Sequence, residues 1–199
     1  MLSRRHLVLG LGGLAAGLVA PNPVQSAIIG LQGPLPSSST MSAGKLIPAP
    51  AAWLSLLRRH PELAPKEAPF VPVQLSVARA AQLVKVNKEV NKEITFRDDT
   101  RGADLWQVGV REGDCEDYAI RKLQVLVEGH GFPRGALTLA ACRLESGRGH
   151  AVLLVHSDRG VYVMDNLAYR VTPWRALPYS WVAREEPGAP FLLWRNLTV

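Results

Sequence analysis

The chain has 199 residues, of which 47% are hydrophobic and 20% are charged, and its formal net charge at pH 7 is +6. This composition is typical of a globular protein that is long enough to bury one core. The lysines and arginines are scattered along the sequence rather than clustered, which argues against a nucleic-acid-binding protein.

The first 27 residues have the pattern of an export signal. Arg4 and Arg5 precede an apolar run of fourteen residues, Leu7 to Ala20, and small residues follow up to Ala27. Fourteen apolar residues are too few to span a membrane, so the pattern favours a cleaved signal peptide. The paired arginines resemble a twin-arginine signal, although a general secretory signal can look similar. We therefore expect an exported protein whose mature part has no transmembrane span.

The rest of the chain divides into an N-terminal arm and a core. Residues 28–75 begin with a stretch rich in Pro, Ser and Gly, and Ala51–His60 is predicted to form a short helix. A longer amphipathic helix is predicted from Ser76 to Glu93. From this helix onward, residues 76–199 are predicted to form a single core without internal repeats.

The stretch around Cys115 is predicted to begin a second helix. Apolar residues recur after it at helical spacing up to Gly129, which places Cys115 in the first turn. The unsatisfied N–H groups and partial positive charge of that end favour a thiolate. Asp114 is expected to cap this helix, with Asp117 in a position resembling that of a capping box.

The pattern changes to strands after this helix. Strands are predicted at Ala136–Leu144, His150–His156 and Val161–Asp165, and a last one at Phe191–Trp194. Helices followed by a hairpin-rich antiparallel sheet are typical of an α+β fold. We therefore expect the helix that begins at Cys115 to pack on this sheet.

The two cysteines allow two interpretations. In an oxidising compartment, Cys115 and Cys142 could form a disulfide. Cys142 lies within a predicted strand, however, where a cysteine usually acts as a small buried apolar residue. A cysteine at a helix start, followed later in the chain by His and Asp, fits a nucleophile better.

The predicted hairpin places a histidine and an aspartate on one face of the sheet. If His156 pairs with Val161, His150 is opposite Leu167 and Asp165 is its diagonal neighbour. Any loop with an even number of residues keeps His150 and Asp165 on the same face, because strand side chains alternate with a period of two. Diagonal neighbours remain within reach of long side chains.

A thiolate nucleophile needs a base that moves a proton and a carboxylate that orients the base. Cys115, His150 and Asp165 supply these three groups. Taken alone, His150 could be a strand-end histidine bonded to a backbone carbonyl, and Asp165 could belong to a turn. Their common face and the position of Cys115 favour a catalytic triad.

Several motifs resemble those of the bacterial transglutaminase-like cysteine proteinases. They are Gly-Asp-Cys-Glu-Asp-Tyr-Ala-Ile at 113–120, Val-Asn and Val-Asn at 86–87 and 90–91, Asp-x-Trp at 104–106, His-Ala-Val-Leu at 150–153 and Val-Met-Asp-Asn-Leu at 163–167. The resemblance implies a papain/transglutaminase-like core. It also implies a periplasmic protease with Cys115 as nucleophile, His150 as base and Asp165 as the orienting residue.

The same resemblance implies calcium, with Asp114 and Glu116 as ligands together with Asp104. A cation would offset the negative charge around the thiolate, and carboxylate oxygens suit Ca²⁺. Asp117 is a further ligand or only a capping residue. Without a metal, all these acids could simply interact favourably with the helix N-terminus.

The partners that the resemblance implies are a large surface adhesin, cut in its N-terminal region, and the periplasmic domain of an inner-membrane cyclic-di-GMP receptor. These would make the protein a regulator of biofilm attachment. Two other functions remain open, namely a transglutaminase-like acyltransferase that uses an amine in place of water, and a non-catalytic exported binding module of the same fold.

Overall fold

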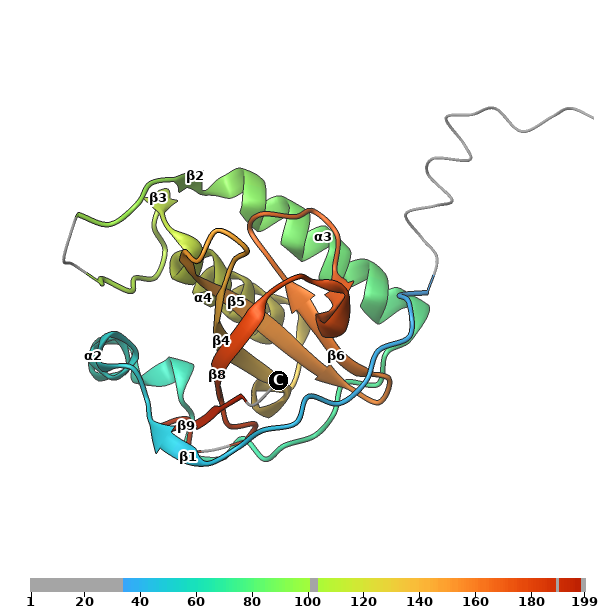
Figure 1. The fold of residues 1–199 in the computed structure, drawn as a ribbon. Helices are drawn as coiled ribbons and strands as arrows, with labels where there is room; N and C mark the ends of the chain where they lie inside the picture. Colours follow the sequence, from blue (N-terminus) through green and yellow to red (C-terminus); the bar gives the residue numbers. More distant parts are fainter. Residues whose placement is uncertain (1–33, 101–103, 189, 198–199) are drawn as a thin grey trace, which may run out of the picture. The chain divides into compact units, whose positions relative to one another are not determined.

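A computed structural model describes residues 34–100, 104–188 and 190–197, all within the unit Gln32–Val199 (Figure 1). The predicted signal peptide at 1–27 lies outside these residues. None of the helices in the described part is long and apolar enough to cross a membrane.

Helix α3 (Val77–Glu93) forms close to where its sequence pattern predicts it. Ser76 is the N-cap, and its side chain accepts a hydrogen bond from the Arg79 N–H at 3.2 Å. The helix ends where Ile94 adopts an extended conformation. Its apolar stripe is buried, so both the burial of one face and the capped N-terminus stabilise the helix.

Helix α4 (Cys115–Gln124) begins at Cys115, as predicted. It continues as a π-helical turn, Val125–Gly129, so the helical segment extends to the predicted Gly129. A shorter helix, α2 (Ala51–Arg59), confirms the predicted helix in the arm.

The main sheet has seven strands in the order β1-β9-β8-β4-β5-β6-β7, and every neighbouring pair is antiparallel (Figure 1). The strands are β1 (Leu46–Pro48), β4 (Leu137–Arg143), β5 (Gly149–Ser157), β6 (Gly160–Met164), β7 (Thr172–Pro173), β8 (Ser180–Glu185) and β9 (Leu193–Asn196). A separate parallel pair joins β2 (Thr95–Phe96) to β3 (Glu112–Gly113), just before α4. The predicted α+β class is confirmed.

The last predicted strand, Phe191–Trp194, begins two residues too early. Phe191 has a positive φ of 50°, which an extended strand does not allow, and β9 starts at Leu193. The Phe191 ring instead packs against the guanidinium of Arg134, whose Cζ lies 3.9 Å from the ring centroid. Phe191 is therefore buried in the interior at a point where the backbone is not extended.

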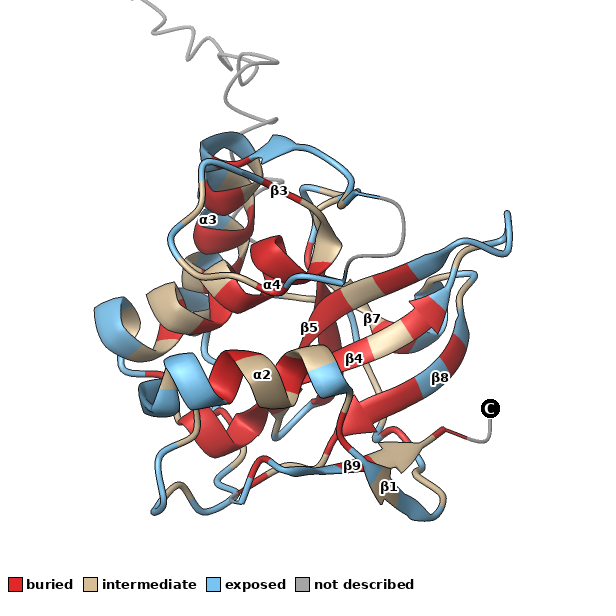
Figure 2. Cartoon of the chain, turned by 90° about the vertical axis from the view of Figure 1, so that its left-hand side faces the viewer, coloured by how far each residue is buried: buried red, intermediate tan, exposed pale blue. Residues whose placement is uncertain are grey.

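Each face of the sheet has its own core. Side chains of β5 and β6 that include Leu153 and Tyr162 join the buried faces of α2, α3 and α4 in one large cluster. Figure 2 shows these three helices on the same side of the sheet, each with buried residues. The alternate residues, among them Val152 and Val163, pack with Trp174 in a second cluster on the other face.

The segment before β1 lies along this second face. The Ser39 carbonyl accepts hydrogen bonds from the Val161 N–H and from the indole N–H of Trp174, both at 3.0 Å. Met41 is buried in the same cluster. The described part of the arm is thus attached to the core at the edge of β6.

Candidate active site

The β5–β6 hairpin has the register that the sequence predicts. His156 pairs with Val161, and the ladder continues to Ser157 and Gly160, so only Asp158 and Arg159 form the turn. This register keeps His150 and Asp165 on one face, and His150 Nε2 lies 2.9 Å from Asp165 Oδ1. Both side chains are buried, with exposures of 1% and 2%.

The carboxylate of Asp165 is held by three donors. Oδ1 accepts from His150 and from the Leu167 N–H at 2.9 Å, and Oδ2 accepts from the Tyr179 hydroxyl at 2.6 Å. Burial opposes ionisation, but the hydrogen bond and charge of His150 and the bond from Tyr179 hold the pKa of Asp165 below its ordinary value. Asp165 is therefore an ionised acceptor, and His150 Nε2 is the donor of their hydrogen bond.

The other imidazole nitrogen of His150 is available. Nδ1 is buried and has no hydrogen-bond partner among the described residues. The sulfur of Cys115 lies next to the same strand, where it accepts the Ala151 N–H at 3.3 Å. The start of α4 thus meets the start of β5, and the three predicted triad residues lie around this junction.

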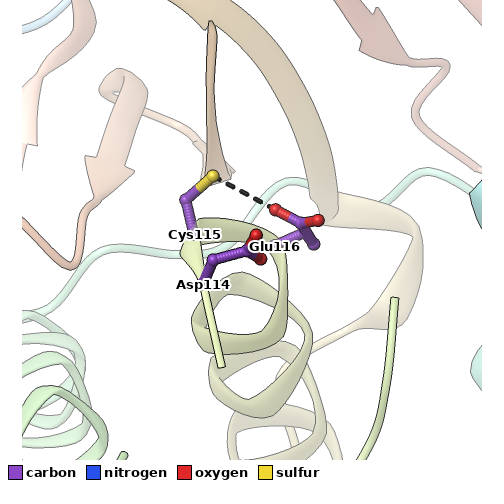
Figure 3. A group of neighbouring side chains, drawn as sticks. All are labelled: Asp114, Cys115 and Glu116. Carbon is purple, nitrogen blue, oxygen red and sulfur yellow. Dashed lines mark hydrogen bonds between the residues drawn. The ribbon is translucent and has the colours of Figure 1, made fainter. Parts of the chain in front are cut away.

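Asp114, Cys115 and Glu116 form a tight cluster at the start of α4, and each has a potential ligand atom within 4.8 Å of the others (Figure 3). The thiol of Cys115 donates to Glu116 Oε2 at 3.1 Å. Burial, followed by the charge of Glu116, raises the pKa of Cys115 well above its ordinary value. Burial also raises the pKa of Glu116, to about 8. Without a cation, this cluster works against the thiolate.

The predicted capping by Asp114 is corrected by the structure. Asp114 is the N-cap residue, but its side chain makes no capping hydrogen bond. Its Oδ1 is buried without a partner among the described residues, and its carboxyl interacts with that of Glu116. The Asp114 carboxyl thus interacts with Glu116 and not with the helix N–H groups.

Asp117 links the start of α4 to the preceding loop. Its Oδ1 accepts the backbone N–H of Gln107 at 2.8 Å, and burial raises its pKa to about 7. Gly113 allows this arrangement because a Cβ at that position would collide with the Asp117 carboxylate.

Asp104, the third expected calcium ligand, accepts the indole N–H of Trp106 at 2.8 Å. Its carboxylate is not part of the cluster formed by Asp114, Cys115 and Glu116. Its assignment as a ligand stays a prediction.

Two residues near the pair were not identified from the sequence. Tyr179 lies near the C-terminus, and no local sequence pattern distinguishes it from other aromatic residues. Asn91 belongs to a motif, but its role was not predicted. Its amide Nδ2 donates to the Asp165 carbonyl at 2.8 Å and to the Ala168 carbonyl at 3.1 Å, so α3 holds the segment that follows β6.

The disulfide interpretation is wrong, since Cys115 and Cys142 are both free. Cys142 is opposite His150 in the β4–β5 ladder and is buried in the second cluster, as expected of a small apolar residue.

The model of the bacterial transglutaminase-like cysteine proteinases matches residues 43–198, so the chain belongs to this family. No curated protein matches it. Calcium-bound LapG of Legionella pneumophila is 28% identical over 52% of this chain and 62% of that chain, with a TM-score of 0.47. EGTA-treated LapG of the same organism is also 28% identical, over 52% and 61%, with a TM-score of 0.46. The chain therefore matches only about three fifths of the length of these solved relatives.

Proposed function

We propose that the protein is a calcium-dependent periplasmic cysteine protease with Cys115, His150 and Asp165 as its triad. One observation carries the proposal. Asp165 binds Nε2 of His150 and leaves Nδ1 without a partner, while the Cys115 sulfur lies against the neighbouring Ala151 N–H. A thiol, a base with one free nitrogen and a buried orienting carboxylate are the parts that thiol proteolysis requires.

The roles follow from these contacts. His150 takes the thiol proton, and the Cys115 thiolate attacks the carbonyl carbon of the scissile peptide bond. His150 then returns the proton to the leaving amine, and a water molecule hydrolyses the thioester. Asp165 holds the imidazole in the tautomer that has its lone pair on Nδ1. The backbone N–H of Cys115, at the start of a helix, is the natural donor to the oxyanion.

Two N–H groups in the loop of Trp106 and Gln107, which precedes α4, are already bonded and are not free to serve as the second oxyanion donor. The indole N–H of Trp106 donates to Asp104, and the backbone N–H of Gln107 donates to Asp117. The side-chain amide of Gln107 is our proposed second donor.

The acids at the start of α4 fit a calcium site. Asp114 has a buried oxygen without a partner in the described part of the chain, and Glu116 is a second hard oxygen ligand beside it. These two residues would hold the ion, and Asp104 is proposed as a third ligand. The bound cation would supply positive charge that favours the ionised forms of these carboxylates and of the thiol.

The proposed substrate is the N-terminal region of a large surface adhesin, cut to control biofilm attachment. The proposed regulator is the periplasmic domain of an inner-membrane cyclic-di-GMP receptor. Both proposals rest on the resemblance of the sequence motifs alone.

The test of the triad is Cys115→Ala in the purified protein, incubated with adhesin fragments from its own organism. We expect cleavage to be abolished while the circular dichroism spectrum is unchanged. The matched control is Cys142→Ala, which removes the other free thiol and should retain most of the activity. If Cys115→Ala still cleaved the substrate, or if a folded Cys142→Ala did not, the assignment of Cys115 as the nucleophile would be wrong.

The test of calcium is titration calorimetry on chelator-stripped protein. We expect one Ca²⁺ to bind, Asp114→Ala and Glu116→Ala to weaken binding, and added Ca²⁺ to restore cleavage after chelation. Magnesium should replace calcium poorly, because it requires a smaller octahedral shell and loses water reluctantly. If no heat of binding were measured and cleavage were insensitive to the chelator, these acids would not bind calcium and would only interact with the helix N-terminus.

A further inference from the structure

Tyr179 lies in the short connection before β8, on the face of the sheet that carries the second cluster. Its ring packs against Trp181, with centroids 5.9 Å apart, and Trp181 packs against Trp174 at 6.3 Å. The indole of Trp174 is in turn bonded to the Ser39 carbonyl. A line of packed aromatic rings, fixed at its far end, therefore determines where Tyr179 points.

Tyr179 points at the His150–Asp165 pair. Its hydroxyl donates to Asp165 Oδ2 at 2.6 Å, and its ring meets the imidazole of His150 edge to face, with centroids 5.9 Å apart. Tyr179 is itself half-buried, whereas both partners are almost completely buried. The tyrosine thus contacts both members of the pair and is more exposed than either.

The two carboxylate oxygens of Asp165 have different partners. Oδ1 accepts from His150 and from the Leu167 N–H, while the one hydrogen bond to Oδ2 among the described residues comes from Tyr179. Without that donor, a buried charged oxygen would have no partner, and the carboxylate would gain freedom to rotate or to recruit water. Either change would loosen the bond that orients the imidazole.

We propose that Tyr179 is a positioning residue of the triad, which locks Asp165 and shields the His150–Asp165 hydrogen bond from water. This role depends on the proposed function only in that the His150–Asp165 pair is taken to be catalytic. Burial and the bond to Asp165 raise the pKa of Tyr179, so the hydroxyl stays protonated and acts as a donor. Tyr179 moves no proton in the reaction.

The test is Tyr179→Phe, which removes the hydroxyl and keeps the ring against His150. The matched control is Tyr162→Phe. Tyr162 also has one hydroxyl bond, to the Pro36 carbonyl at 2.8 Å, but its ring lies in the cluster on the opposite face. Both variants lose one hydrogen bond of a tyrosine, so a purely structural effect should be similar in the two.

The first readout is proton NMR of the imidazole N–H of His150, in protein labelled with ¹⁵N-histidine and kept in calcium. We expect a downfield, exchange-protected resonance, identified by its loss in Asp165→Asn. In Tyr179→Phe this proton should exchange with water at least several-fold faster, and in Tyr162→Phe it should not change. Equal exchange in all three proteins would overturn the proposal.

The second readout is activity. In Tyr179→Phe we expect the rate of Cys115 alkylation by iodoacetamide at one fixed pH to fall, and kcat for proteolysis to fall roughly ten-fold with KM unchanged. A rise in KM alone would overturn the proposal. If the wild-type protein cleaves no adhesin fragment but the exchange and alkylation results hold, the positioning role stands and the protease proposal fails.

Discussion

Lys122 places an amino group in the protein interior, on the same helix that begins at Cys115. The side chain is fully buried, and Nζ has no hydrogen-bond partner within the described residues. It lies 5.9 Å from the centre of the Tyr118 ring. Burial lowers the pKa of Lys122 to about 7, although the charge of Asp165 opposes the shift.

This residue should make the stability of the protein depend on pH. In the unfolded chain Lys122 titrates near its ordinary pKa of 10.5, so the unfolded state binds more protons than the folded state between about pH 7 and 10.5. The contribution of Lys122 to the free energy of unfolding therefore rises with pH across this window, and the full cost of burial is present below about pH 7.

We expect Lys122→Met to be more stable than the wild type below pH 7, by a few kcal/mol at roughly 1.4 kcal/mol per pKa unit. The advantage should shrink as the pH approaches 10.5. Urea unfolding of both proteins at several pH values measures the difference. The exposed Lys85→Met is the control and should show little pH dependence. A pH-independent difference for Lys122→Met would contradict the interpretation.

Helix α3 acts on the candidate site through its asparagines. Asn91 donates to the carbonyls of Asp165 and Ala168, and Asn87 donates to that of Ala168 alone at 2.8 Å. The segment that carries Asp165 leaves the sheet after β6, so it depends on these side chains for its position. Asn87 is buried on the stripe of α3 that faces the core, where an apolar residue would otherwise be expected, and the partly buried Asn91 follows about one helical turn later.

We expect Asn91→Ala to reduce kcat by roughly ten-fold, because the backbone carbonyls of Asp165 and Ala168 lose the donor that holds this segment in place. Asn87→Ala should lose similar stability and much less activity, since its one contact is three residues beyond Asp165. Steady-state kinetics and urea unfolding of both variants test this. Equal losses of kcat would show that α3 supports the loop only through general stability.

Across the whole molecule, local patterns predicted more of the fold than of the site. Alternation along β5 and β6 determined which residues share a face, and this was enough to place His150 beside Asp165. Helical spacing likewise placed Cys115 at a helix start. These predictions succeed because a period and a turn depend only on residues that are close in sequence.

The contacts that were missed join segments far apart in the chain. Tyr179 reaches Asp165 because a line of aromatic rings directs it, and no pattern around a single tyrosine reports this. Asp114 was predicted as a cap from its neighbours, whereas its actual conformation depends on burial beside Glu116. Arg134, between Pro133 and Gly135, would be expected in an exposed turn, yet its side chain is buried.

Arg134 joins distant parts of the chain in the interior. Its guanidinium binds Glu185 of β8 at 2.9 Å, and it donates to the carbonyls of Leu63 at 2.7 Å and Leu137 at 2.6 Å. The ring of Phe191 covers one side of it. The exposed fractions of Arg134 and Glu185 are 4% and 0%, so neither charge can turn to solvent.

Removal of one partner should therefore be costly. We expect Glu185→Gln to lower the free energy of unfolding by roughly 3–5 kcal/mol, because it leaves a buried arginine that cannot lose its proton. In Arg134→Met the remaining carboxyl can take up a proton instead, and burial already raises the pKa of Glu185. The loss in Arg134→Met should thus become smaller as the pH falls.

The double variant Arg134→Met/Glu185→Gln shows how much of the loss comes from leaving one buried charge without its partner. Because it leaves neither charge behind, its loss of stability should be clearly smaller than the sum of the two single losses. Urea unfolding of the full cycle measures the coupling. The exposed pair Arg97–Glu112, 74% and 55% accessible, is the control, and Glu112→Gln should cost no more than about 1 kcal/mol. If Glu185→Gln cost as little as Glu112→Gln, water or another group would have to compensate the buried guanidinium, and the ion pair would not be what joins β8 to the start of β4.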